Sequence, residues 1–230
     1  MTAAPIDPGR PPLAVIPGLW CFAPNRDCQG GTAWLLALAD GDLLVDCPAL
    51  SEANLSFLEA RLEARPARGR IVLTSREGHG RVRRLQERLG WPVLVQEQEA
   101  YLLPNLAERI AWGEESEPAA GLRLLWAPGP TPGSCVVHVQ EPAAVGLDIL
   151  FCGRLLGPTA PGRLAPLRTA RTFHWPRQQR SLVRLRQWLP PASPQWIACG
   201  GGLGALRGDK LVAGGSSLIS ELAEQVATAA

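Results

Sequence analysis

The stretch from Ile71 to His79, IVLTSREGH, decides the fold. Its apolar, β-branched beginning ends at Thr74 and gives way to short polar residues, and a helical spacing of Val82, Leu85 and Leu89 follows. This order predicts a buried strand, a loop and then a helix. Functional groups in open α/β sheets usually lie at the carboxyl ends of strands, so we expect the loop to carry the site.

The regions on both sides of this stretch alternate in a regular way: several strands, a βαβα region, more strands and a final βα unit. Two sheets packed face to face with helices outside satisfy this order, so we predict an α/β fold that is a four-layer αβ/βα sandwich. We expect an irregular acidic loop over 105–121 and a long irregular connection over 153–175. The expected strands are 18–22, 32–39, 43–46, 71–74, 93–95, 122–127, 135–139, 148–152 and 196–199. The expected helices are 51–65, 80–89, 97–103, 176–189 and 216–228.

The composition is that of an ordinary globular protein, with 46% hydrophobic and 19% charged residues in 230. We predict a loose N-terminal leader over 1–16 and a single domain over 17–230. The leader is rich in proline and lacks an apolar core, so it does not resemble a secretory signal. The chain also lacks an apolar run of the roughly 20 residues that a membrane span needs. We therefore expect a cytoplasmic protein.

Charge is distributed unevenly along the chain. Residues 1–148 contain 13 Arg and 18 acidic residues, whereas residues 149–208 contain nine Arg and no acidic residue. An acid-free segment of this length predicts a basic face and an anionic ligand or acidic partner.

Five short motifs follow one another in an order that resembles the metallo-β-lactamase fold. A strand end, Leu43–Pro48, is similar to the early Leu-Ile-Asp-Thr-Gly motif of that family, and Thr74–His79 stands where its His-x-His-x-Asp-His loop stands. Ala127–Ser134 is similar to its Pro-Gly-His-Thr-Pro-Gly-Ser loop, and Leu150–Arg154 to its Leu-Phe-Thr-Gly-Asp strand end. Cys199–Gly202 is similar to the late Pro-Gly-His-Gly motif. The resemblance implies the sandwich fold and, in the family, zinc-dependent hydrolysis.

The residues at the implied metal positions differ from those of the family. Arg154 replaces the bridging aspartate, and His79 is the one histidine left near the first loop. A hydrolytic zinc needs three protein ligands and an open position for water, and a permanently charged guanidinium repels a cation. We therefore expect no cofactor, with zinc as the alternative. The expected vestigial rim is Asp46, Ser75, Glu77, His79, Pro130, Arg154 and Gly201.

Three functions follow as hypotheses. The first is a non-catalytic protein that binds an anionic small molecule or partner at the altered rim, with Arg154, Arg163, Arg168 and His174 as candidate anion-binding residues. The second is a thioester or ester hydrolase, similar to glyoxalase II, that uses an unusual site with Glu77 or His79 as general base. The third is RNA binding by the arginine-rich C-terminal half. Its candidate helix carries Arg177, Arg180, Arg184 and Arg186.

Two further groups of residues are candidate site components. Cys47, Cys152 and Cys199 each follow a strand, so a thiol cluster is conceivable, but we expect inert buried thiols. His138 alternates with Val137 and Val139, which predicts an ordinary strand residue.

Overall fold

The computed structural model describes residues 7–65, 67–141 and 147–228, and its chain divides into two compact units. Unit 1 comprises the described residues up to Leu73, Glu77–Val95 and Leu103–Ile110. Unit 2 comprises Thr74–Arg76, Gln96–Leu102 and the described residues from Ala111 onward. No helix in the described part of the chain is both long and apolar enough to cross a bilayer.

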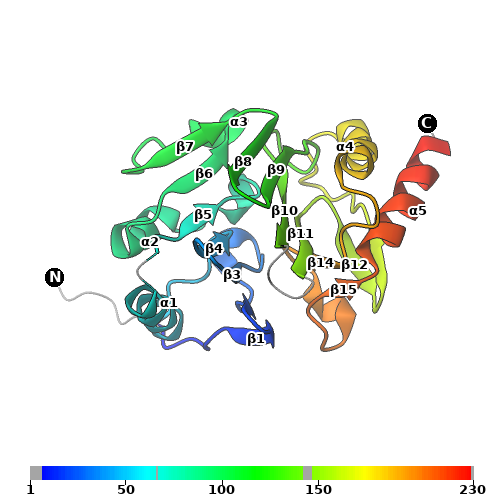
Figure 1. Ribbon diagram of the computed structural model, residues 1–230. Coiled ribbons are helices and arrows are strands. Elements are labelled where there is room, and N and C mark those ends of the chain that lie inside the picture. Colours follow the sequence, from blue (N-terminus) through cyan, green and yellow to red (C-terminus); the bar gives the residue numbers. More distant parts are fainter. Residues whose placement is uncertain (1–6, 66, 142–146, 229–230) are drawn as a thin grey trace. The chain divides into compact units, whose positions relative to one another are not determined.

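A seven-stranded mixed sheet in the order β1-β2-β3-β4-β5-β6-β7 forms the centre of unit 1 (Figure 1). Strands β1 to β4 pair in an antiparallel manner, whereas β4, β5 and β6 run parallel. Parallel strands need helical crossovers, and α1 and α2, which contact each other, supply them. The strands are β1 (Leu13–Ile16), β2 (Leu19–Cys21), β3 (Trp34–Leu38), β4 (Gly41–Val45), β5 (Arg70–Val72), β6 (Val93–Gln96) and β7 (Arg109–Trp112), and the helices are α1 (Glu52–Ala64) and α2 (Val82–Leu89).

The local signals that predicted these helices are confirmed. Ser51 caps α1, because its side chain accepts a hydrogen bond from the backbone N–H of Asn54. Gly90 ends α2 in a left-handed conformation with φ 66°, which glycine adopts without steric cost. Leu85 and Leu89 on α2 are buried, as the apolar spacing requires.

Unit 2 contains a six-stranded mixed sheet in the order β15-β14-β11-β10-β9-β8. Strands β11 and β14 run parallel, the pairs β8–β9, β9–β10, β10–β11 and β14–β15 are antiparallel, and a separate antiparallel hairpin joins β12 to β13. The strands are β8 (Glu115–Ala119), β9 (Leu122–Trp126), β10 (Cys135–Glu141), β11 (Leu147–Gly153), β12 (Gly157–Ala160), β13 (Arg163–Ala165), β14 (Trp196–Cys199) and β15 (Val212–Ala213), and the helices are α3 (Glu97–Ala100), α4 (Trp175–Trp188) and α5 (Gly215–Thr228).

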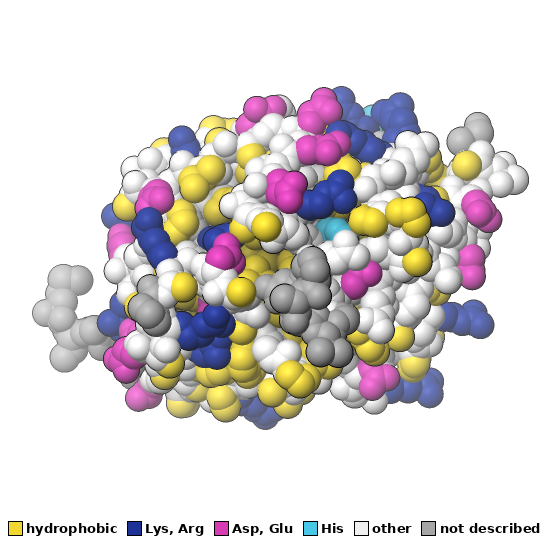
Figure 2. All heavy atoms as spheres, in the orientation of Figure 1, with side chains coloured by type: hydrophobic (Ala, Val, Ile, Leu, Met, Phe, Trp, Pro, Cys, Tyr) yellow, Lys and Arg dark blue, Asp and Glu magenta, His cyan; other side chains and the backbone are white. Residues whose placement is uncertain are grey.

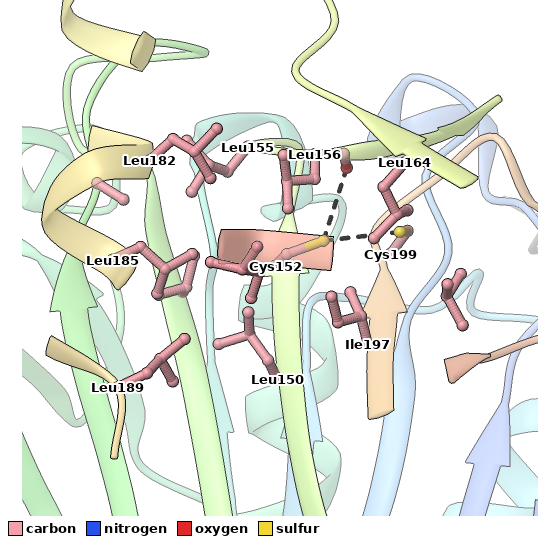
Figure 3. Close-up of a cluster of buried hydrophobic side chains, with 14 of the residues drawn as sticks. Leu150, Cys152, Leu155, Leu156, Leu164, Leu182, Leu185, Leu189, Ile197 and Cys199 are labelled. Carbon is pink, nitrogen blue, oxygen red and sulfur yellow. Dashed lines mark hydrogen bonds between the residues drawn. The ribbon is translucent and has the colours of Figure 1, made fainter. Parts of the chain in front are cut away.

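Leucines of α4, and Leu189 directly after it, pack onto this sheet as part of the core of unit 2. Figure 3 shows Leu182, Leu185 and Leu189 directed toward Leu150 and Ile197 of the sheet. All five are buried. Burial of one leucine side chain contributes roughly 1.5–3 kcal/mol, so this helix is held mainly by its apolar stripe.

The α/β class with two large mixed sheets and helices is confirmed, but three segments differ from the prediction. Strand β1 (Leu13–Ile16) pairs with β2, so the last four residues of the predicted leader belong to a sheet. Strands β7 and β8 lie within 105–121, and β12 and β13 lie within the predicted irregular connection. These short strands carry polar, proline or exposed residues, so the apolar alternation that marks a half-buried strand is missing from them. The single domain over 17–230 stays a prediction.

Candidate functional site

Three of the predicted rim residues lie in unit 1. Asp46 follows β4, is buried, and has a left-handed backbone with φ 62°, which is uncommon for a residue with a side chain. A Cβ atom on Gly78 would overlap the Oδ1 atom of Asp46, so only glycine fits there. The Cys47 N–H donates to Gly78 O at 3.0 Å. Glu77 and His79, both half-buried, flank Gly78. The Asp46 carboxylate is therefore fixed against the loop that the first stretch predicted.

Unit 2 brings the strand ends near Ser75 together. Thr74 O accepts a hydrogen bond from Cys135 N at 2.8 Å. A Cβ atom on Gly153 would lie 2.8 Å from Thr74 Oγ1, and Gly153 has φ 53°. Gly200 N donates to Gly153 O at 2.8 Å. The segment that carries Ser75, the end of β11 and the end of β14 thus meet within one unit.

Arg154 directly follows this junction and is half-buried. Its Nη1 atom lies 3.9 Å from the position that a Cβ atom on Gly201 would take, so the guanidinium passes beside the Gly201 backbone. A side chain at position 201 would occupy space next to the guanidinium. Arg154 and Gly201, which stand at positions where the resemblance implies metal ligands, are therefore neighbours.

The loop that carries Pro130 is held by Glu99, a residue that sequence reasoning missed. Glu99 on α3 is 1% exposed, and its carboxylate accepts the backbone N–H of Arg76 at 2.5 Å and that of Gly133 at 3.1 Å. The carbonyl of Pro130 accepts the Phe173 N–H at 3.1 Å. Glu99 therefore positions the loop after Ser75 and the Pro130 loop through backbone hydrogen bonds, a role that no local pattern in the sequence indicates.

The other candidate anion-binding residues differ in their environments. Arg163 and Arg168 are exposed, and neither forms an ion pair with another described residue. His174 is exposed and caps α4, since its Nδ1 atom accepts the Arg177 N–H at 3.2 Å. The gathering of all seven predicted rim residues at one place stays a prediction.

The side chains at the implied metal positions do not fit a zinc ion. Proline and glycine at 130 and 201 supply no side-chain donor, Ser75 supplies a neutral hydroxyl, and Arg154 supplies a cation. Across the residues that the structure describes, no three His, Cys, Asp or Glu side chains are grouped to hold a metal ion. The residues at positions 75, 130, 154 and 201 therefore supply none of the side chains that zinc usually takes as ligands.

His138 belongs to a buried polar cluster and is not an ordinary strand residue. Its Nε2 atom lies 2.8 Å from Asp148 Oδ1 and 2.9 Å from Ser193 Oγ, and Ser193 Oγ donates to the same Asp148 oxygen at 2.7 Å. Asp148 Oδ2 also accepts the Gln195 N–H at 3.2 Å. Burial lowers the pKa of His138 from 6.5; the Asp148 hydrogen bond and charge oppose this, and Arg123 lowers it slightly further.

This cluster does not have the geometry of a catalytic triad. Asp148 and Ser193 both meet the Nε2 atom of His138, while Nδ1 is buried without a hydrogen-bond partner among the described residues. A triad histidine uses one ring nitrogen for the acid and the other for the nucleophile. The cluster instead anchors the turn before β14.

The thiols are buried, as expected, and divide between the two units. In unit 1 the Cys28 Sγ–H donates to Cys47 O at 3.1 Å, and burial raises the pKa of Cys47 well above its usual range. In unit 2 the Sγ atoms of Cys152 and Cys199 are 3.6 Å apart in the leucine core (Figure 3), and the Cys152 hydrogen bond and burial raise the pKa of Cys199. Thiols in such surroundings are poor nucleophiles.

The four arginines of α4 differ in whether their side chains contact other residues of the chain. Arg184 forms ion pairs with Glu114 at 3.1 Å and Glu115 at 3.3 Å, and Arg186 Nε donates to Ser220 Oγ at 2.6 Å. The remaining pair, Arg177 and Arg180, is exposed. On the face shown in Figure 2, Lys and Arg side chains are interspersed with Asp and Glu. Half of the expected basic helix face is thus used in contacts within the chain.

No family model and no curated protein matches this sequence. Solved structures do match its fold. An archaeal metallo-β-lactamase superfamily protein from Sulfolobus tokodaii aligns with TM-score 0.57 and 18% identity, over 90% of this chain and 85% of that chain. The metallo-β-lactamase DIM-1 aligns with TM-score 0.65 and 15% identity, over 97% and 99%.

A third structure is described as the first B3 metallo-β-lactamase with an active-site glutamic acid. It aligns with TM-score 0.63 and 18% identity, over 95% of this chain and 88% of that chain. At these identities the likeness shows the fold alone. The resemblance that the sequence motifs indicated is confirmed at the level of the fold.

Proposed function

We propose that this chain, which has the metallo-β-lactamase fold, binds an anionic small molecule or partner through Arg154 and lacks zinc-dependent hydrolysis. The observation that carries the proposal is the half-buried guanidinium of Arg154 beside the Gly201 backbone, at positions where the resemblance implies metal ligands. Replacing an aspartate by an arginine reverses the charge at that point. The same position that would attract a cation when it carries an aspartate would therefore attract an anion when it carries an arginine.

The surroundings of Arg154 support the same proposal. The segment 149–208, to which Arg154 belongs, contains nine Arg and no acidic residue, so its net charge is strongly positive. Gly153 and Gly200 pack closely and fix the strand ends that hold it. A guanidinium on a fixed backbone loses little freedom when it binds a carboxylate or phosphate in a bidentate manner.

Binding measurements on Arg154 variants test the proposal. Inorganic phosphate and succinate would be titrated into the wild-type protein and into Arg154→Gln, with Arg10→Gln, an exposed arginine outside the candidate anion-binding set, as control. We expect Arg154→Gln to weaken binding about tenfold or more, because one charge-assisted contact is worth roughly 1.5–3 kcal/mol. Equal weakening by both variants would contradict a specific site.

Metal analysis of the purified protein tests the second half of the proposal. We expect zinc and iron far below one ion per chain, and no change in thermal stability on adding a chelator. A metal that binds only the native state would raise its stability by mass action, so a chelator-dependent loss would contradict the proposal.

Hydrolysis without a complete zinc site is the second candidate function. The position of Glu77 favours it. Glu77 is half-buried beside the residue that touches Asp46, and one structural neighbour is described as having an active-site glutamic acid. A carboxylate in this position can act as general base on a water molecule. Esterase and thioesterase assays of the wild type and Glu77→Gln would decide, since activity that Glu77→Gln abolishes would favour hydrolysis. RNA binding stays a prediction, tested by the salt dependence of affinity.

A further inference from the structure

Unit 1 contains an open cavity of about 1160 Å³ that the candidate site does not use. Its walls come from residues 24–27, residues 49–51 at the start of α1, and one side of α2. None of the predicted rim residues is among the described residues that line it. Small-molecule sites commonly have volumes of roughly 300–1,000 Å³, so the cavity is large enough for an organic ligand.

The acidic side chains of this cavity already have partners. Asp27 forms an ion pair with Arg81 at 2.8 Å, and Glu87 forms one with Arg83 at 3.0 Å. The Oδ1 atom of Asp7 accepts a backbone N–H two residues further on, at 2.9 Å. These contacts reduce the negative charge that the walls present to a ligand.

The basic side chains that line the cavity outnumber the acidic ones. Arg88 has Glu59 as an ion-pair partner at 3.7 Å. Arg26 and Arg84 line the cavity and are exposed, and within the described part of the chain their guanidinium groups form no hydrogen bond or ion pair. Two charged groups with five N–H donors each are therefore directed to solvent in one concave site.

The backbone that carries Arg26 is firmly held. The side chain of Asn25 accepts the Asp27 N–H at 3.0 Å and donates through Nδ2 to Cys47 O at 3.1 Å. The Cys28 thiol donates to the same carbonyl at 3.1 Å. A preformed loop reduces the entropy lost on binding, because little besides the arginine side chain must become ordered.

We propose that this cavity binds an organic diphosphate, such as a nucleoside diphosphate. A guanidinium matches the geometry of a phosphate in a bidentate contact, and Arg26 and Arg84 can each take one phosphate group. Pro24, Leu50 and Leu55 add apolar surface to the wall, which a carbon-rich moiety would cover. The volume exceeds what two phosphate groups alone would fill.

Calorimetric titration with adenosine diphosphate tests this site, with inorganic pyrophosphate as the second probe. The variants are Arg26→Gln and Arg84→Gln, and the matched control is Arg180→Gln, an exposed helical arginine of unit 2. We expect each cavity variant to weaken binding of adenosine diphosphate about tenfold or more, and the control to leave it unchanged. All these side chains are exposed, so the unfolding midpoint should stay that of the wild type.

Several results would overturn the proposal. Absence of binding to the wild type, or equal weakening by Arg180→Gln, would exclude a specific diphosphate site. Pyrophosphate binding as tightly as adenosine diphosphate would remove the role assigned to the apolar wall. Arg154→Gln should leave this binding unchanged, and a loss there would place the ligand at the other candidate site. Failure of this proposal is thereby distinguishable from failure of the proposed function.

Discussion

At the scale of single residues, the contact between Asp46 and Gly78 determines the shape of the loop after β5. The carboxylate occupies the space in which any side chain at position 78 would lie. Asp46 itself adopts a left-handed backbone conformation, φ 62°, which an aspartate tolerates better than most residues. The Asp46 side chain therefore contributes to the packing of this loop.

The variant Gly78→Ala should destabilise the protein by about 1–3 kcal/mol, because its Cβ atom and Asp46 Oδ1 cannot occupy the same place. Urea-induced unfolding would measure the change. Gly204→Ala is the matched control, since a Cβ atom there meets no other atom within 4 Å and its backbone is not left-handed. Equal effects of the two substitutions would show that the contact does not constrain the loop.

At the scale of elements, the helices could be predicted from the sequence, because they depend on local apolar periodicity and on capping residues. The helices α1 and α2 were found from Ser51, Gly90 and the leucine spacing, because caps and apolar stripes are local signals. The roles of Glu99 and Ser193 were missed, since their hydrogen-bond partners lie far away in the sequence. No local sequence pattern around a single carboxylate or hydroxyl identifies hydrogen-bond partners that are distant in the sequence.

The polar cluster that joins β10, β11 and the turn before β14 should make stability depend on pH. Burial lowers the pKa of His138 in the folded state below its unfolded value of about 6.5, despite Asp148, and the charge of Arg123 acts in the same direction as burial. Between those two pKa values the unfolded chain binds a proton that the native state does not. The free energy of unfolding should therefore be highest above pH 6.5, fall as the pH drops below it, and level off below the folded pKa.

Urea unfolding of the wild type and of His138→Gln at a series of pH values would check this contribution. The wild type should lose more stability than the variant when the pH falls from about 7.5 to 5, because the variant lacks the imidazole. Parallel profiles for the two proteins would assign the pH dependence to other groups.

At the scale of the whole molecule, the metallo-β-lactamase fold is kept while the donors at the implied metal positions are replaced. The ends of β11 and β14 still meet through Gly153 and Gly200, although Arg154 and Gly201 offer no metal ligand. The packing of these strand ends therefore does not depend on a metal-ligating side chain at position 154 or 201. This is why the fold could be predicted from glycine- and proline-containing motifs, whereas the function needs experiments on individual side chains.

The six cysteines report on the folding of the whole chain, because three lie in each unit and all are buried. A thiol reacts through its thiolate. Burial raises the pKa of Cys47, and the hydrogen bond from Cys152 together with burial raises the pKa of Cys199. Alkylation therefore requires that the surrounding structure open. We expect iodoacetamide to label none of the six in the native protein during a time that labels all six in guanidinium chloride.

Mass spectrometry of peptides from labelled protein would follow the two sets of thiols separately. The set Cys21, Cys28 and Cys47 reports on unit 1, and the set Cys135, Cys152 and Cys199 reports on unit 2. As denaturant is raised, labelling of each set should rise with the unfolding transition seen by circular dichroism, because protection comes from burial in the folded core. Rapid labelling of any cysteine in the native protein would show that its thiol is accessible and would reopen a reactive role for it.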